Sequence, residues 1–177
     1  VTANAELAPD GTMTMDRLDD SNTVSTALVT QSITAYPTAS VVYCSIVLKQ
    51  GTAAKSDVNC YATGDAEVNA KVTWGANPTT NLGTLTPYIY GTYLLQFTVT
   101  TTAVGTFNFR VWAADRASVT NIGDVYVWGA RASLTPLNVP YTQTTSTAVT
   151  TSQDLLSCSS STFNFYRSEE RRVGKEC

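Results

Sequence analysis

Histidine is absent from this chain of 177 residues. Its absence excludes a Ser-His or Cys-His nucleophilic device and any zinc site built on histidine. Charged side chains make up only 14% of the residues, whereas about a quarter is usual. The net charge of -3 argues against a nucleic-acid partner, which would require a basic patch. No apolar run approaches the length of a membrane-spanning helix, so membrane insertion is not expected.

The residues that are present favour a β protein. Hydrophobic residues at 43% and aromatic residues at 10% supply enough apolar surface to bury a core. No window shows a helical period, whereas several stretches alternate apolar and polar residues as strands do. These predicted strands cover residues 23–35, 41–49, 57–62, 67–74, 92–100, 106–113 and 124–128. The pattern predicts an all-β fold, an antiparallel β-sandwich of the jelly-roll type.

Glycine and proline punctuate this strand pattern. In Pro9-Asp10-Gly11, proline presets φ, aspartate caps its own backbone and glycine accepts a positive φ, so a turn is expected. The strand over 67–74 leaves room for a β-bulge. The last strand is expected to end at Gly129, and Pro136 and Pro140 then lead the chain away, because proline gives no N–H to a sheet.

The sequence changes character after this strand. Residues 1–141 are predicted to form the sandwich domain, and the threonine-rich residues 142–151 suit an extended linker. Residues 152–166 end in Thr162-Phe163-Asn164-Phe165-Tyr166, which looks like the first strand of a following domain.

The tail over 167–177, RSEERRVGKEC, is unlike the rest. It holds four of the 11 Lys+Arg and three of the 14 Asp+Glu. It resembles the in-frame translation of a common sequencing-library adapter. We therefore expect a non-native tail on a metagenomic fragment, with the natural chain running on past Tyr166. A solvated charged terminus is the alternative.

The cysteines do not decide between an oxidising and a reducing compartment, because they fit a disulfide and free thiols alike. Cys44 and Cys60 fall on the inward side of two predicted strands that are joined by a short turn and are expected to be adjacent. A facing pair would permit a disulfide, and two buried thiols fit the same pattern. Cys158 has no partner in the body of the chain, and Cys177 belongs to the tail.

Strand alternation predicts a core face and an opposite face that combines aromatic and polar side chains. The expected core residues are Tyr93, Leu95, Phe97, Phe107, Phe109 and Val111. Aromatic rings suit the apolar side of a sugar, and amides or arginine suit its hydroxyl groups. The candidate carbohydrate-binding residues on the opposite face are Gln96, Asn108, Arg110, Trp112, Tyr126 and Trp128. The alternative for Tyr126 and Trp128 is structural packing at the sheet edge.

The sequence offers two further candidate sites. The loop aromatics Tyr36, Tyr88 and Tyr90 would form an end-on binding site, with ordinary loop anchoring as the alternative. An acidic cluster near the N-terminus suggests a structural calcium ion, although the DxDxDG spacing is absent and solvated loop acids are the default. The calcium candidates are Asp10, Asp19 and Asp20, with Asp16 in the same cluster.

No enzymatic activity is expected from this chain. Carboxylate pairs serve glycoside hydrolysis. However, Asp65, Glu67, Asp115 and Asp124 fall in predicted turns or at strand ends, where no pocket is implied.

Four segments of the chain match, in order, four motifs that occur together in one family of proteins. APDGTMTMDRL at 8–18 resembles APDGTxTADKL, and SIVLKQG at 45–51 resembles SVYLKAG. GTYLLQFTVT at 91–100 resembles GWYRCSLTFT, and residues 125–144 resemble VYLWGAQLExGxxxTSYIPT. The chain departs from these patterns at Met15, at Thr92 and at Arg131-Ala132-Ser133, where the family has alanine, tryptophan and QLE.

In these segments the chain resembles the carbohydrate-binding-module-like jelly rolls of phage tail fibres, tail spikes and related virion proteins. This resemblance implies a galactose-binding-like fold in a virion or extracellular appendage. The leading hypothesis is a non-catalytic module that contacts host-surface glycans. Its expected partners are a cell-surface glycan, other domains of the same fibre chain and further copies in a homotrimer. The alternatives are a structural spacer or oligomerisation domain of a fibre, and an ancillary module of a depolymerase or endolysin.

Overall fold

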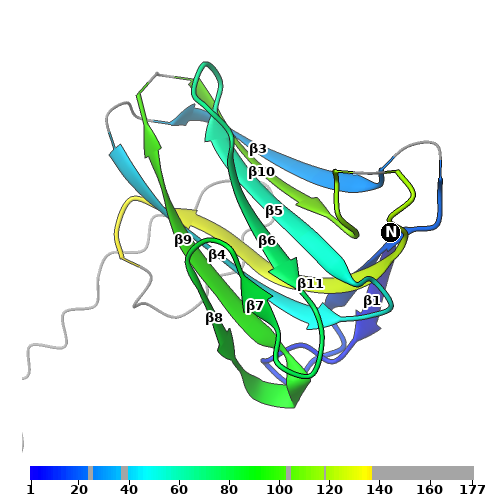
Figure 1. Cartoon of the computed structure of the whole chain (residues 1–177). Coiled ribbons are helices and arrows are strands. Elements are labelled where there is room, and N and C mark those ends of the chain that lie inside the picture. The colour runs from blue at the N-terminus through cyan, green and yellow to red at the C-terminus, as the bar shows by residue number, and fades with distance from the viewer. Residues whose placement is uncertain (24–25, 37–39, 103–104, 118, 137–177) are drawn as a thin grey trace, which may run out of the picture. The chain divides into compact units, whose positions relative to one another are not determined.

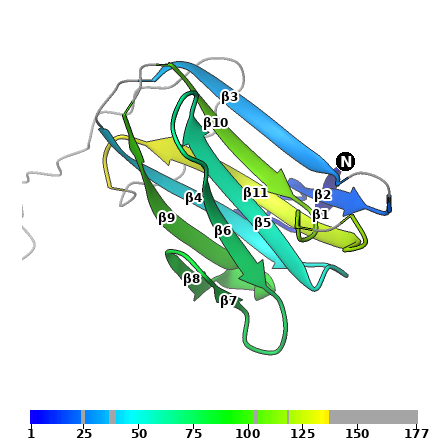
Figure 2. The same cartoon turned by 45° about the horizontal axis from the view of Figure 1, so that its top comes forward.

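The computed structural model describes residues 1–23, 26–36, 40–102, 105–117 and 119–136. This part of the chain forms two antiparallel sheets that pack face to face (Figure 1, Figure 2). The predicted all-β sandwich is therefore confirmed. The first sheet has the strand order β1-β2-β11-β4-β9-β8, and the second has the order β3-β10-β5-β6-β7.

The strands of the first sheet are β1 (Thr2–Glu6), β2 (Met15–Asp20), β4 (Ser40–Gln50), β8 (Thr84–Pro87), β9 (Tyr93–Thr101) and β11 (Gly123–Ser133). Those of the second sheet are β3 (Leu28–Tyr36), β5 (Lys55–Ala62), β6 (Val68–Thr73), β7 (Thr79–Thr80) and β10 (Gly105–Trp112). A short 3-10 helix, Ile89–Gly91, lies between β8 and β9. Among the residues described, no helix is long and apolar enough to cross a membrane.

The seven predicted strands are all present, with ends that shift by a few residues. β3, for example, begins at Leu28, five residues after the predicted start. Strands β1, β2, β7 and β8 were not predicted. Their sequences lack apolar alternation, and pairing with a neighbour makes them strands, as when β2 pairs with β11.

The core lies between the sheets. The predicted core residues Leu95, Phe97, Phe107, Phe109 and Val111 are each at most 5% exposed, and Tyr93 packs against them. The inward and outward sides of β9 and β10 were therefore predicted correctly.

Cys44 on β4 and Cys60 on β5 meet in this core from opposite sheets. The expectation that their strands are neighbours in one sheet is wrong, because the turn after Gln50 carries the chain from the first sheet to the second. Both thiols are free and buried. Burial above all, and then the adjacent Cys44, raise the pKa of the Cys60 thiol.

β11 contains a β-bulge that shapes the site described below. Trp128 pairs with Val47 and Arg131 pairs with Ser45, so β11 has one more residue than β4 over this interval. Gly129 has a φ of 61°, a left-handed conformation that favours glycine. The strand therefore continues past Gly129, where it was predicted to end.

The sequence left room for a β-bulge in the strand over 67–74, but β6 pairs with β5 in unbroken register. The predicted domain end at 141, the linker over 142–151, the strand within 152–166 and the tail over 167–177 lie outside the described residues, as does Cys158.

Candidate ligand-binding cleft between the sheets

The two sheets part along one side of the sandwich. A cavity of about 400 Å³ opens there, lined by β3 of the second sheet and by β2 and β11 of the first. Val29 on β3 pairs with the core residue Val111 and points inward, yet it is 40% exposed. An inward-facing valine keeps this exposure only where the opposite sheet does not close over it. We call this cavity the inter-sheet cleft.

The cleft has an apolar floor and a polar rim. The floor consists of Leu18, Ile46, Phe109, Val111 and Val127. The polar rim residues are Asp10, Thr12, Thr14, Asp16 and Gln31, and Trp128, Gly129 and Ala130 of the bulge complete the wall with Val29. A cavity of about 300–1,000 Å³ with apolar walls and a few polar groups is the usual form of a small-molecule site.

A chain of hydrogen bonds holds the rim together. The Asp10 carboxylate accepts hydrogen bonds from the backbone N–H and the hydroxyl of Thr12, at 3.0 and 2.6 Å. The hydroxyls of Thr12 and Thr14 lie 2.7 Å apart, and the indole Nε1 of Trp128 donates to the Thr14 hydroxyl at 3.1 Å. The bonds from Thr12 lower the pKa of the Asp10 carboxyl. The turn at Pro9-Asp10-Gly11, where Gly11 has a φ of 83°, thus connects to the bulge through two hydroxyl groups.

Asp16 is the second carboxylate of the rim. It pairs with Val127, which packs against the core, so its side chain lies on the inner side of the first sheet. Its Oδ1 accepts a hydrogen bond from the backbone N–H of Asn4 at 3.1 Å.

The sequence contains a signal for this rim. Asp10, Thr12, Thr14 and Asp16 are polar residues at every second position, which suggests one shared side of an extended chain. Asp10 was predicted only as a calcium candidate, and Asp16 only as a member of the same acidic cluster. Gln31 and Val29 carry no such signal, because they face the same cavity only through the pairing of β3 with β10.

The six predicted carbohydrate-binding residues do not form one face. β9 belongs to the first sheet and β10 to the second, so their outward side chains lie on opposite sides of the sandwich. Gln96, Tyr126 and Trp128 are on the outer side of the first sheet, and Asn108, Arg110 and Trp112 are on that of the second. The expectation of a shared face was therefore wrong.

On the second sheet, arginines cover the aromatic rings. The Arg110 guanidinium lies 4.6 Å from the ring centre of Tyr61, and that of Arg116 lies 5.1 Å from the ring of Trp112. Glu67 pairs with both, at 3.2 Å to Arg110 and 2.7 Å to Arg116. Trp112 is only 6% exposed, so its ring is not a free platform for a sugar.

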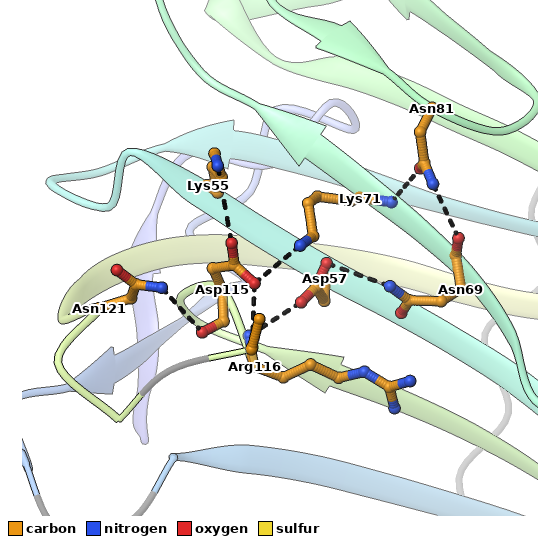
Figure 3. A network of polar contacts seen from close by, with 9 residues as sticks. Lys55, Asp57, Asn69, Lys71, Asn81, Asp115, Arg116 and Asn121 are labelled. Atoms are coloured by element: carbon orange, nitrogen blue, oxygen red, sulfur yellow. Dashed lines mark hydrogen bonds and ion pairs between the residues drawn. The ribbon is translucent and has the colours of Figure 1, made fainter.

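A polar network continues beside these residues (Figure 3). Asp115 pairs with Lys71 at 2.8 Å and with Lys55 at 3.7 Å. Burial alone would raise the pKa of Asp115, but bonds from Lys71 and from the Ala117 backbone N–H hold it below its ordinary value. The buried Asp57 accepts a bond from the Arg116 backbone N–H at 2.9 Å. These contacts fasten the segment after β10 onto β5 and β6.

Asn108 also has internal partners. Its side-chain oxygen accepts a hydrogen bond from the Ser32 hydroxyl at 2.8 Å, and its amide donates to the Thr106 carbonyl at 3.3 Å. None of the three predicted residues on the second sheet is therefore available without loss of a contact within the protein.

On the first sheet, Tyr126 and Trp128 pack on a small second cluster formed by Ala8, Met15, Val47 and Leu94. This is the structural role given as the alternative for both aromatics. Gln96 pairs with Ser45 two strands away from β11. Of the six predicted residues, Trp128 alone also lines the inter-sheet cleft.

The three tyrosines considered for an end-on site belong to segments at opposite ends of β9. Tyr88 and Tyr90 are 54% and 50% exposed and precede β9. The Tyr36 backbone pairs with Gly105 at the start of β10, which follows the opposite end of β9.

The calcium candidates have separate partners. Asp10 belongs to the rim, Asp19 pairs with Arg17 at 3.0 Å, and Asp20 accepts a bond from the Ala27 backbone N–H at 2.9 Å. In the described part of the chain, no group of three or more His, Cys, Asp or Glu residues is placed to hold a metal ion.

The carboxylates considered for catalysis also hold the fold together. Asp65 accepts a bond from the Thr102 backbone N–H at 2.8 Å, and Asp124 pairs with Arg17 at 3.0 Å. Asp115 and Glu67 have the partners described above.

No protein-family model matches this chain, and no curated protein matches it. Inference about its function therefore rests on the cleft and on the sequence motifs.

Proposed function

We propose that this sandwich is a non-catalytic module of a phage tail fibre or a similar virion or extracellular appendage, and that it contacts host-surface glycans. The observation that carries the proposal is the inter-sheet cleft, in which an apolar floor meets a rim of carboxylate, hydroxyl and amide groups beside Trp128. The four motif resemblances and the sandwich fold support the same class of module, a galactose-binding-like jelly roll.

The two parts of the cleft suit the two parts of a sugar. Phe109, Val111 and Val127 offer apolar contact to C–H groups, and Asp10 and Asp16 accept hydrogen bonds from sugar hydroxyls. The hydrogen-bond chain from Asp10 to Trp128 holds the rim in place before a ligand arrives, which reduces the entropy lost on binding.

Blocking the cleft tests the proposal. In Val29→Trp the larger side chain should enter the cleft, because Val29 faces inward and is partly exposed. We expect the full chain to bind glycans on an array and Val29→Trp to bind at least about tenfold more weakly. Thr30→Trp is the matched control, since Thr30 neighbours Val29, pairs with Arg110 and faces outward.

Thermal unfolding of both variants should stay close to that of the wild type. Equal glycan binding by Val29→Trp and Thr30→Trp would place any site outside the cleft. Absence of binding by the wild type, even at high valency, would favour the alternative of a structural spacer within a fibre.

A further inference from the structure

The described residues that line the inter-sheet cleft carry negative charge without a compensating cation. Asp10 and Asp16 are the charged residues among them, and they include neither lysine nor arginine. Elsewhere in the described chain, the carboxylates of Glu6, Asp19, Glu67, Asp115 and Asp124 form ion pairs. Asp10 and Asp16 form none with the described residues.

Each rim carboxylate is held through one oxygen. Asp10 uses Oδ1 for both bonds from Thr12, and Asp16 uses Oδ1 for the bond from Asn4. The Oδ2 atoms accept no hydrogen bond from the described residues. Each carboxylate therefore has a fixed orientation and one oxygen left to bind a donor on a ligand.

We propose that the cleft selects sugars with a free amine, that is hexosamine units, over their N-acetylated counterparts, and that it rejects uronic and sialic acids. The inference rests on the proposed glycan-binding function and specifies its ligand class.

Charge complementarity supports this choice. An ammonium group on the sugar replaces a neutral hydroxyl or amide donor with a charged one, and charge-assisted hydrogen bonds are the stronger kind. A carboxylate on the ligand would meet two like charges at the rim, with no cation among the described lining residues to offset them. For a partly exposed contact we expect the amine to improve affinity about fivefold.

Isosteric variants separate charge from shape. In the double variant Asp10→Asn, Asp16→Asn each side chain keeps an Oδ1 acceptor for its internal partner while both charges are removed. Asp19→Asn is the matched control, because it removes one carboxylate on the same strand as Asp16 but outside the cleft.

The experiment is isothermal titration of the full chain with three tetrasaccharides, made of glucosamine, N-acetylglucosamine and glucuronic acid. It is run at mildly acidic pH, where an amine is protonated and an ordinary carboxyl is ionised. We expect the glucosamine oligomer to bind best, the N-acetylated one about fivefold more weakly, and the glucuronic acid oligomer not to bind. In the double variant the first two should bind equally, whereas Asp19→Asn should keep the preference.

Each result has one meaning. Equal affinity of the wild type for the amine and the N-acetyl oligomers, or a preference that survives in the double variant, would overturn the inference and leave glycan binding intact. Binding of the acidic oligomer would do the same. If none of the three binds, and the glycan array is also negative, the inference and the proposed function both fail.

Discussion

At the scale of single residues, Gly51 shows how closely the first sheet is fitted. A Cβ at this position would overlap the carboxylate and the backbone oxygen of Asp124, while Asp124 accepts bonds from Thr52 and Arg17. Gly51→Ala should therefore lower the free energy of unfolding by about 1–3 kcal/mol, because a packed site must open. The measurement is chemical denaturation. Gly105→Ala, whose new Cβ would meet only ordinary contacts, should be close to neutral. A neutral Gly51→Ala would contradict this account.

At the same scale, Trp112 shows why a sugar-binding residue could not be predicted from strand alternation. Trp112 is an aromatic residue on the outward-facing side of its strand, which is where a sugar platform would lie. However, Arg116 lies over its ring, and Glu67 forms an ion pair with that arginine. This contact joins three separate segments, β10, the loop after it and the residue before β6. Strand alternation carries no information about which side chain of another segment covers an outward-facing ring.

At the scale of elements, the bulge in β11 can be tested by deletion. Removal of Gly129 would leave Ala130 opposite Ile46 and keep both Trp128 and Arg131 on the outer side, because β11 has one residue more than β4 here. We expect the deletion to cost no more than about 2 kcal/mol, within the usual range for single changes. It should also weaken glycan binding at least about tenfold, because the bulge lines the cleft.

Thermal unfolding and titration of the full chain measure the two effects. The control is deletion of Ser45 from the central strand β4. The register of β4 would then shift by one residue before or after the deletion, and the buried side chains of that part of the strand would turn outward. This deletion should abolish folding. If the two deletions lowered thermal stability equally, Gly129 would not be an extra residue that the sheet can lose.

The elements also mark which part of the fold could be predicted. The inward side of β9 and β10 followed from alternation, since a period of two depends only on local sequence. The assignment of these two strands to different sheets did not, because pairing depends on distant partners such as Cys44 with Phe97 and Cys60 with Phe109. The cleft could not be predicted either, because it depends on how far β3 stands from β2.

At the scale of the whole molecule, four carboxyl groups make stability depend on pH in one direction. Hydrogen bonds and ion pairs lower the pKa of Glu6, Asp10, Asp115 and Asp124, in the last two against the opposing effect of burial. A carboxyl with a lower pKa in the folded state stabilises the fold above its unfolded pKa, near 4. This contribution is lost as pH falls through the folded value.

The free energy of unfolding should therefore be level from about pH 5 to about pH 8 and decline below about pH 4, because there the unfolded chain binds protons first. Asp115→Asn combined with Asp124→Asn should be less stable near neutral pH, since the partners Lys71 and Arg17 lose their ion pairs. The free energy of unfolding of this double variant should also decline less steeply on acidification. Chemical denaturation at a series of pH values measures both effects.

Asp10→Asn is the control, because its exposed carboxyl is screened by water and its removal should change the slope little. A double variant that declines as steeply as the wild type would show that Asp115 and Asp124 are not the groups that set the acid limit.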